Sequence, residues 1–179
     1  MRFIFFICSV FLFSCAHKPV PVVVTDSKVM FLNGLYKQSI EVTYVKDGKS
    51  ENHQFNGMLK KSDKEIYLYC YVGFGISLFK LKDNFKGPVD FVASDERIEK
   101  NKDFFLKMYP VIKEIILLQK ESSRLKGNEM TLAMGPDHFP VHIKISSEQT
   151  GPVPKQIVIE NAEHFRFAIT NTDFDLETK

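Results

Sequence analysis

The chain has 179 residues, of which 44% are hydrophobic and 26% are charged, and its net charge is +2. This length predicts one domain with at most a tail, and the composition is typical of a globular chain rather than a disordered one. Positive and negative charges are nearly equal in number, so the chain has no large excess of basic residues for binding nucleic acid, and we expect no nucleic-acid partner.

The amino terminus has the pattern of an export signal. Arg2 precedes an apolar run from Phe3 to Phe13, whose 11 residues are too few to span a bilayer that needs about 20. The next residues, Leu12-Phe13-Ser14-Cys15, resemble the lipobox of bacterial lipoproteins. This resemblance implies cleavage after Ser14 and lipidation of Cys15. An ordinary signal peptide followed by a coincidental cysteine, or an unprocessed hydrophobic start, is the alternative.

The lipobox divides the chain into three parts. Residues 1–14 are expected to be the signal peptide, residues 15–26 a lipidated tether, and residues 27–179 the folded domain. By resemblance to proteobacterial lipoproteins, Ala16 after the lipidated cysteine indicates an outer-membrane location, with the lipid-anchored domain facing the periplasm. The inner membrane and the cell surface stay open as alternatives.

Three cysteines are present, and we expect two of them to be removed or lipidated. Cys8 leaves with the signal peptide and Cys15 carries lipid, so Cys70 is the remaining thiol and no intramolecular disulfide is expected. Cys70 lies in the apolar run IYLYCYV, which predicts a small buried hydrophobic residue rather than a reactive one.

The first half of the domain predicts a meander of strands. Turn signals at Asp47-Gly48, Ser62-Asp63 and Asp83-Asn84 separate segments rich in β-branched and aromatic residues. The expected strands are 39–46, 52–60, 65–72, 75–82 and 85–92. Because consecutive strands joined by short turns pair antiparallel, the sheet is expected to be antiparallel. Gly87-Pro88 weakens the fifth strand, which is therefore expected to lie at an edge of the sheet or to contain a bulge.

The pattern then changes to a helical one. Apolar residues recur at three-to-four spacing from Phe104 to Ile116, which predicts an apolar helix face. Pro110 is expected to divide this stretch into two helices, 98–108 and 110–121. Four further short strands are expected at 129–134, 141–146, 155–160 and 165–170. Nine strands and two helices give an α+β architecture.

Two neighbouring strands are unusually apolar. The segment 66–72 is apolar on both faces. In an antiparallel strand with one solvent-exposed face, apolar residues alternate with polar ones. We therefore expect helices to cover one face and an apolar cavity, a partner or lipid to cover the other. The alternative is that the tyrosine hydroxyls reach solvent over a simple core.

No catalytic constellation is present, so we expect neither an enzyme nor a bound cofactor or metal. His138 and His142 have the spacing of a metal pair on a helix, but their surroundings predict a strand. Asp90, Asp95 and Glu96 lie where a strand meets a helix, and acids are favourable at a helix amino terminus.

Gly73-Phe74-Gly75 joins the two most apolar strands. Two glycines allow a sharp turn that leaves Phe74 at its tip. Phe74 then either folds back into the core or forms an exposed apolar finger for a membrane or ligand.

The order of these features resembles LolB, the outer-membrane lipoprotein receptor family, and the LolA/LolB superfamily more widely, over about residues 38–170. The resemblance is carried by five segments: 55–59 (FNGML), 65–68 (EIYL), 73–79 (GFGISLF), 153–159 (VPKQIVI) and 165–167 (FRF). It implies a strongly curved antiparallel half-barrel of about nine strands, with two helices packed on the concave side over an apolar cavity.

The resemblance also implies a function. In that family the cavity takes up the acyl chains of lipoproteins, and a protruding loop at the position of Phe74 helps membrane transfer. We expect a lipid-anchored protein that binds acyl chains or another hydrophobic ligand in lipoprotein or lipid trafficking. The expected ligand-binding residues are Phe55, Leu59, Leu68, Leu78, Phe105, Met108, Ile112 and Ile116.

Two other classes of function are open. The first is a structural or assembly lipoprotein that docks an envelope protein partner through an apolar surface. The second is a hydrolase of envelope polymers, which the lack of a paired-acid or nucleophile motif disfavours. Uptake of a hydrophobic probe would separate ligand binding from scaffolding, and convergent carboxylates in a cleft would favour the hydrolase.

Overall fold

The computed structural model describes most of the expected folded domain. The described residues are 31–46, 48–118, 123–124, 126–135, 139–147, 153–161 and 164–177. The predicted signal peptide, the lipidation site Cys15 and the tether lie outside these residues, as does His138. All strands and helices reported below fall between residues 31 and 177, so a form of the chain that starts at Ala16 retains them all.

Nine strands of the described part form one antiparallel sheet, as the sequence predicts. They are β1 Gly34–Lys46, β2 Lys49–Lys61, β3 Ile66–Val72, β4 Ile76–Asp83, β5 Asp90–Ala93, β6 Glu129–Met134, β7 Phe139–Ser147, β8 Pro154–Asn161 and β9 Phe165–Leu176. Their order is β5-β4-β3-β2-β1-β9-β8-β7-β6. Two meanders, β1–β5 and β6–β9, are thus joined where the first strand pairs with the last.

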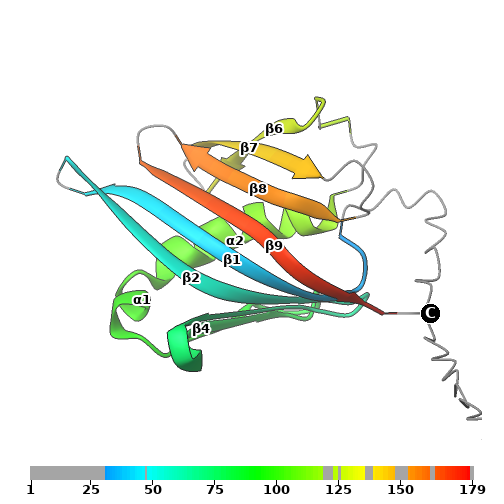
Figure 1. Ribbon diagram of the computed structural model, residues 1–179, viewed down its shortest axis with the longest axis horizontal. Helices are drawn as coiled ribbons and strands as arrows, with labels where there is room; N and C mark the ends of the chain where they lie inside the picture. Colours follow the sequence, from blue (N-terminus) through cyan, green and yellow to red (C-terminus); the bar gives the residue numbers. More distant parts are fainter. Residues whose placement is uncertain are drawn as a thin grey trace, which may run out of the picture.

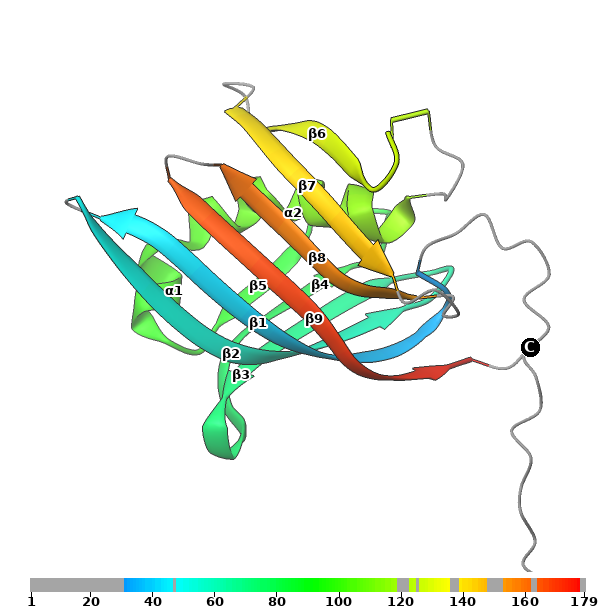
Figure 2. The ribbon, with the colours of Figure 1, turned by 45° about the horizontal axis from the view of Figure 1, so that its top comes forward.

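The sheet curves around a helix. A short 3-10 turn, η1 Gly73–Gly75, joins β3 to β4, and the helices are α1 Glu96–Lys100 and α2 Lys102–Leu117. Figures 1 and 2 show α2 lying within the concavity of the sheet, with strands of both meanders bending around it. This arrangement is the predicted α+β half-barrel of nine strands with two helices.

The predicted division of the helical stretch at Pro110 is wrong. Helix α2 continues through Pro110, and the break between the two helices lies at Asn101. Pro110 is exposed while its neighbours Met108, Tyr109 and Val111 are buried. The backbone hydrogen bond that proline removes therefore lies on the solvent-exposed side of the helix, where water can donate to the carbonyl that has lost its partner. Packing of the buried side chains keeps the helix continuous.

Several strand boundaries also differ from the expectation, and the largest difference is that β9 continues to Leu176, six residues past its predicted end. Strand β1 begins at Gly34, five residues before the predicted start, and β5 is reduced to Asp90–Ala93. The shortening follows from the Asp83-Asn84 turn, because the Asp83 carboxylate accepts the amide of Phe85 at 2.7 Å and the chain turns away from the sheet. Strand β5 lies at the sheet edge, as its Gly87-Pro88 segment predicts.

Aromatic rings fasten α2 to both halves of the sheet. Phe105 packs against Phe79 of β4 and Phe91 of β5, with ring centroids 5.1 and 6.0 Å away. Its neighbour Phe104 reaches the other way and stacks on Phe167 of β9 at 6.2 Å. The first turn of the helix therefore bridges β4–β5 and β9, strands that are far apart in the sheet.

The second face of β3 is not covered in the described part of the structure. Tyr67, Tyr69 and Tyr71 point outward and are half-buried, and Tyr69 and Tyr71 stack at 5.4 Å. The Lys80 ammonium lies 5.6 Å from the Tyr69 ring. The described residues fit the alternative expectation, in which the tyrosine rings and the lysine stems form a solvent-facing layer on this face.

Among the residues that the structure describes, no helix has the length and apolar character that crossing a membrane requires.

Candidate functional site

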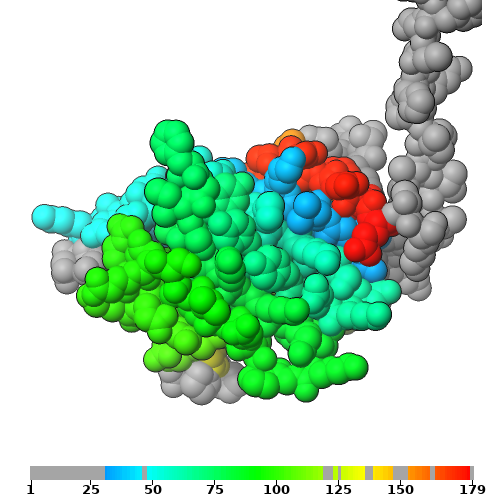
Figure 3. Space-filling view, turned by 90° about the horizontal axis from the view of Figure 1, so that it is seen from below, coloured from blue at the N-terminus to red at the C-terminus, as the bar shows by residue number. Residues whose placement is uncertain are grey.

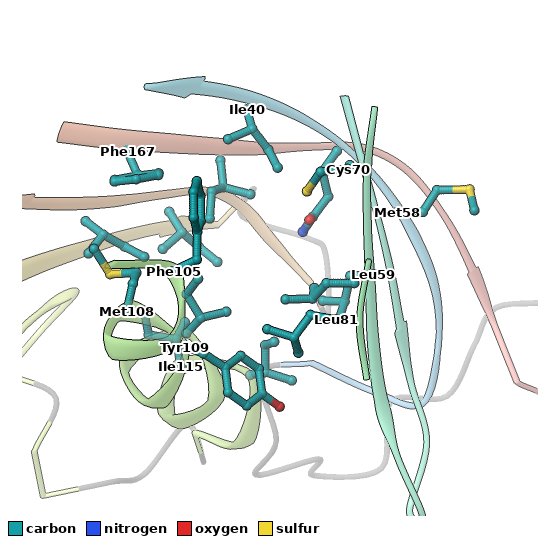
Figure 4. Close-up of a pocket in the computed structure, with 18 of the residues that line it drawn as sticks. Ile40, Met58, Leu59, Cys70, Leu81, Phe105, Met108, Tyr109, Ile115 and Phe167 are labelled. Atoms are coloured by element: carbon teal, nitrogen blue, oxygen red, sulfur yellow. The ribbon is translucent and has the colours of Figure 1, made fainter. Parts of the chain in front are cut away.

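An apolar cavity lies between the concave face of the sheet and α2 (Figure 4). Its volume is about 70 Å³. Its walls come from α2 and from strands of both meanders: Phe31, Gln38, Ile40, Phe55, Gly57, Met58, Leu59, Leu68, Cys70, Phe79, Leu81, Phe105, Met108, Tyr109, Ile112, Ile115, Ile116, Ile157, Ile159, Phe167 and Ile169. Almost every one of these side chains is hydrophobic, so the cavity suits an apolar occupant.

The structure brings together seven of the eight residues expected to bind a ligand. Those that line the cavity are Phe55, Leu59, Leu68, Phe105, Met108, Ile112 and Ile116. The four helical residues share one face of α2 because they recur at three-to-four spacing. The strand residues meet there because Leu59 pairs with Leu68 on the inner face of the sheet.

Leu78 does not line the cavity. The pairing of β3 with β4 shifts at this point, so that Cys70 pairs with Phe79 while Tyr71 pairs with Ser77. Leu78 is buried but has no partner in the ladder, and the alternation restarts with Phe79 and Leu81 on the inner face. A β-bulge of this kind reverses which residues face inward, and alternation alone does not reveal it.

Glycine at position 57 keeps the middle of the inner face open. A Cβ atom on Gly57 would lie 2.8 Å from Cδ1 of Ile40 and 3.4 Å from Oε1 of Gln38. Any larger residue would therefore push these two side chains into the cavity. Gly57 lines the cavity together with Phe55 and Leu59, which alternate with it along β2.

The cavity is small for a lipid. An engineered protein cavity of about 150 Å³ admits benzene, and the 70 Å³ here is less than half of that. An occupant larger than this volume would require α2 to move away from the sheet. The walls would allow this along most of the helix, because apolar contacts have no fixed geometry.

One buried cluster fixes α2 to the sheet by polar contacts, and sequence reasoning treated it as a turn. The Asp83 carboxylate, 2% exposed, accepts hydrogen bonds from the Tyr109 hydroxyl at 2.8 Å and the Phe85 amide at 2.7 Å, and pairs with Lys113 at 2.7 Å. Burial raises the pKa of Asp83, but these three donors outweigh it and hold the pKa below its ordinary value.

Gln38 is the second polar group that sequence reasoning missed. It is 7% exposed, lines the cavity, and donates from Nε2 to Oδ1 of Asn171 at 2.9 Å. The signal was present in the alternation of Ile40, Val42 and Tyr44, which extends back to Gln38 once the strand is allowed to begin earlier.

Cys70 lies on the inner face of β3, as a buried small hydrophobic residue should. Burial raises the pKa of its thiol well above the ordinary value. The neutral thiol is a poor nucleophile, so the prediction of an unreactive cysteine agrees with its surroundings.

Phe74 is fully exposed at the tip of the β3–β4 hairpin, with a relative accessibility of 108%. Its backbone is left-handed, with φ 61° and ψ 19°, which is uncommon for a bulky residue. The hairpin projects from the body of the molecule in Figures 2 and 3. The sequence left open whether Phe74 folds back into the core or is exposed at the tip of the turn, and in the structure it is exposed.

The described residues include no group of three or more metal-ligating side chains. His142 lies exposed on β7, and Asp95 caps α1 by accepting the amide of Arg97 at 2.8 Å. Hydrogen bonds from the Arg97 side chain and amide lower the pKa of Asp95 to about 2. Glu96 pairs with Lys100 on the same short helix, at 2.8 Å. These contacts fit the predicted structural role of the acids at the helix start.

A second hollow, of about 640 Å³, lies at β6 and β7 on the other edge of the sheet. Its polar walls include Lys144, which pairs with Glu129 at 3.3 Å, and Arg124, which pairs with Glu114. The charges that face this hollow are thus largely paired, and it lacks the apolar walls of the cavity under α2.

No family model matches the sequence, and no curated protein matches it either. Among solved structures, the chain is similar to the crystal structure of LolA superfamily protein NE2245 from Nitrosomonas europaea. The two chains share 6% sequence identity over 86% of this chain and 91% of that one, with a TM-score of 0.44. A likeness of this degree assigns neither a family nor a ligand to this chain, and its function has to be inferred from the site.

Proposed function

We propose that this protein is a non-catalytic, lipid-anchored bacterial lipoprotein that binds acyl chains or a similar hydrophobic ligand between its sheet and α2. The observation that carries the proposal is the apolar cavity at the helix–sheet interface, whose walls come from both meanders. Burial of each methylene group there would contribute about 0.8 kcal/mol, which makes a long chain a favourable occupant.

Binding requires the cavity to expand. Helix α2 is held by aromatic rings at its first turn and by Asp83 near its middle, and elsewhere by apolar side chains. A ligand that replaces those apolar contacts with its own leaves the buried area nearly unchanged. The cost of opening is therefore mostly that of straining the polar cluster around Asp83.

The anchor and the location are part of the proposal. The pattern Leu12-Phe13-Ser14-Cys15 supports lipidation of Cys15, and Ala16 supports an outer-membrane location with the domain facing the periplasm. A diacylated and N-acylated cysteine would supply more than the two signals that stable anchoring takes. The domain would then work at a membrane surface in the trafficking of lipids or lipoproteins.

Phe74 would contact the membrane or the incoming ligand. An exposed aromatic residue in a strained backbone costs stability, and such strain concentrates at functional sites. Ile76, 62% exposed on the same hairpin, would add to the apolar tip.

Ligand uptake can be tested with the form that starts at Ala16. Lipids that co-purify are identified by mass spectrometry, and a fluorescent fatty acid is titrated into the delipidated protein. We expect uptake by the wild type and its loss in Ile112→Trp, which fills the cavity. Leu117→Trp, on the exposed side of the same helix, is the matched control and should bind normally.

A wild type that takes up no probe and carries no lipid would overturn ligand binding. That result would favour the alternative function of a structural lipoprotein, whose exposed hairpin docks an envelope protein.

The hairpin is tested by Phe74→Gly. Glycine accepts the left-handed backbone, so the variant should be as stable as the wild type or up to about 1 kcal/mol more stable. Binding to phospholipid vesicles, measured by co-sedimentation, should fall. Phe85→Gly is the control, because Phe85 has the same backbone conformation (φ 62°) away from the tip. Equal vesicle binding by all three proteins would rule out this role for Phe74.

A further inference from the structure

Gln38, which lines the apolar cavity, has one polar atom that no described residue contacts by a hydrogen bond. Gln38 uses its Nε2 to donate to Asn171, and the structure gives its Oε1 no hydrogen bond from any described residue. Buried side-chain atoms without a partner do not occur in the described part of the structure, so Oε1 is not fully enclosed by protein. Gln38 lines the cavity, so the cavity is the space from which Oε1 would be reached.

The orientation of the amide is fixed by a chain of hydrogen bonds. Asn171 is bonded at 2.6 Å to the backbone carbonyl of Pro154, which can accept but not donate. Asn171 must therefore turn its NH₂ group to Pro154 and its oxygen to Gln38. Gln38 must then turn its own NH₂ group to Asn171, which leaves Oε1 as the atom that faces away.

The local backbone aims Gln38 inward. Buried Tyr36, Gln38 and Ile40 alternate along β1, which places Gln38 on the inner face, while the pairing with β9 shifts because Thr172 of β9 is passed over between Asn171 and Asp173. Across the sheet, Gln38 pairs with Gly57, which has no side chain to cover the amide. Oε1 lies 3.4 Å from the place that a Gly57 Cβ would take.

The surroundings of Oε1 do not suit water well. Ordered buried water typically makes about three hydrogen bonds, whereas the neighbouring wall residues are hydrophobic. Of the other polar groups in the wall, the Tyr109 hydroxyl donates to Asp83, and the Cys70 thiol is a weak donor. The site therefore offers one strong acceptor to a molecule that is otherwise apolar.

We propose that the cavity selects acyl chains that carry a hydroxyl group, and that Gln38 is the residue that recognises this hydroxyl. The ligand hydroxyl would donate its proton to Oε1 while the chain packs against the apolar walls. This inference rests on the proposed binding of hydrophobic ligands and names their class. A site built to bond a hydroxyl disfavours the analogue that lacks it, because the acceptor is then left unpaired.

The test compares hydroxylated fatty acids with their parents on the delipidated form that starts at Ala16. The pairs are 3-hydroxytetradecanoate with tetradecanoate and 12-hydroxyoctadecanoate with octadecanoate, each titrated to displace a fluorescent fatty acid. We expect at least one hydroxylated chain to bind on the order of fivefold more tightly than its parent, as one neutral hydrogen bond would give. The position of the preferred hydroxyl reports the depth of Gln38 in the cavity.

The role of Gln38 is isolated by Gln38→Met, which keeps the size of the side chain and removes both amide groups. We expect this variant to lose the preference, so that the two members of each pair displace the fluorescent fatty acid with equal affinity. Gln54→Met makes the same change on the exposed face of β2 and should keep the preference.

The outcomes separate this inference from the proposed function. If neither member of any pair binds, ligand binding itself fails. If both members bind equally to the wild type, the cavity is a plain apolar site and the role of Gln38 is overturned, whether or not Gln38→Met folds. A preference that survives in Gln38→Met would also overturn it.

Discussion

Two polar side chains are buried against the space around α2, and they differ in how completely they are paired. Asp83, at the end of β4, receives three donors within 2.8 Å. Gln38, on β1, gives one hydrogen bond and keeps its acceptor reachable from the cavity. A satisfied buried group stabilises one arrangement of the chain, whereas an acceptor left reachable is suited to a molecule from outside.

The difference assigns separate tasks to two parts of the site. The Asp83 cluster joins the sheet to the middle of α2 and defines the closed position of the helix. The inner face near Gln38 and Gly57 has no comparable polar contact with the helix among the described residues, so only apolar contacts would have to separate there.

The largest effect is expected from Asp83→Ala. The change leaves the Tyr109 hydroxyl buried without its acceptor and frees Lys113, so the free energy of unfolding should fall by about 3 kcal/mol. Urea unfolding of the form that starts at Ala16 measures it. Asp173→Ala removes an exposed pair with Lys37 and should cost at most about 1 kcal/mol. Equal losses in the two variants would refute the distinction between a buried and an exposed pair.

A second prediction uses Cys70 to report opening of the cavity. Its thiol is buried and its pKa is raised, so a thiol reagent should modify the folded wild type slowly. If Asp83 holds α2 closed, Asp83→Ala should speed modification by about tenfold for every 1.4 kcal/mol lost from the opening free energy. The Asp173→Ala control should react at the wild-type rate. Unchanged modification in Asp83→Ala would show that the cluster does not control access.

Acidification should weaken the same cluster. The folded pKa of Asp83 is below its ordinary value, so its carboxylate contributes stability that is complete above the ordinary aspartate pKa of about 3.9. That contribution is lost as the pH falls from there through the lower folded value. The gap in urea midpoint between wild type and Asp83→Ala should therefore be wide at pH 7 and narrow at pH 3. If the difference in urea midpoint between the two proteins widened on acidification, the pKa of Asp83 in the folded protein would have to be raised rather than lowered.

The sequence predicted the strands and the helix face better than it predicted these two polar groups. Alternation and three-to-four spacing report which side of an element is buried, and seven of eight expected residues do line the cavity. The prediction that Leu78 lines the cavity is not met because the bulge in β4 reverses the alternation. A bulge depends on the partner strand, so the sequence of β4 alone does not indicate it.

Alternation can place Gln38 on the inner face, but the hydrogen-bond partners of Asp83 and Gln38 could not be assigned from local pattern. Asp83 has the sequence of an ordinary turn, and its burial depends on Tyr109 and Lys113, which follow about 26 residues later at the nearest. Gln38 depends on Asn171, which is 133 residues away in the chain and adjacent to it through the pairing of β1 with β9. Hydrogen bonds between polar groups far apart in the chain produce no periodic pattern in a single sequence.

The smallest effect is expected from Gln38→Met in the ligand-free protein. The substitution leaves Oδ1 of Asn171 without its donor, which costs stability, but it also removes an acceptor that is already poorly paired. The two changes oppose each other, and the free energy of unfolding should change by less than about 1 kcal/mol. Urea unfolding beside Asp83→Ala checks the contrast directly. A loss as large as that of Asp83→Ala would mean that Gln38 is a structural residue whose two ends are both satisfied, and its acceptor would no longer indicate a ligand.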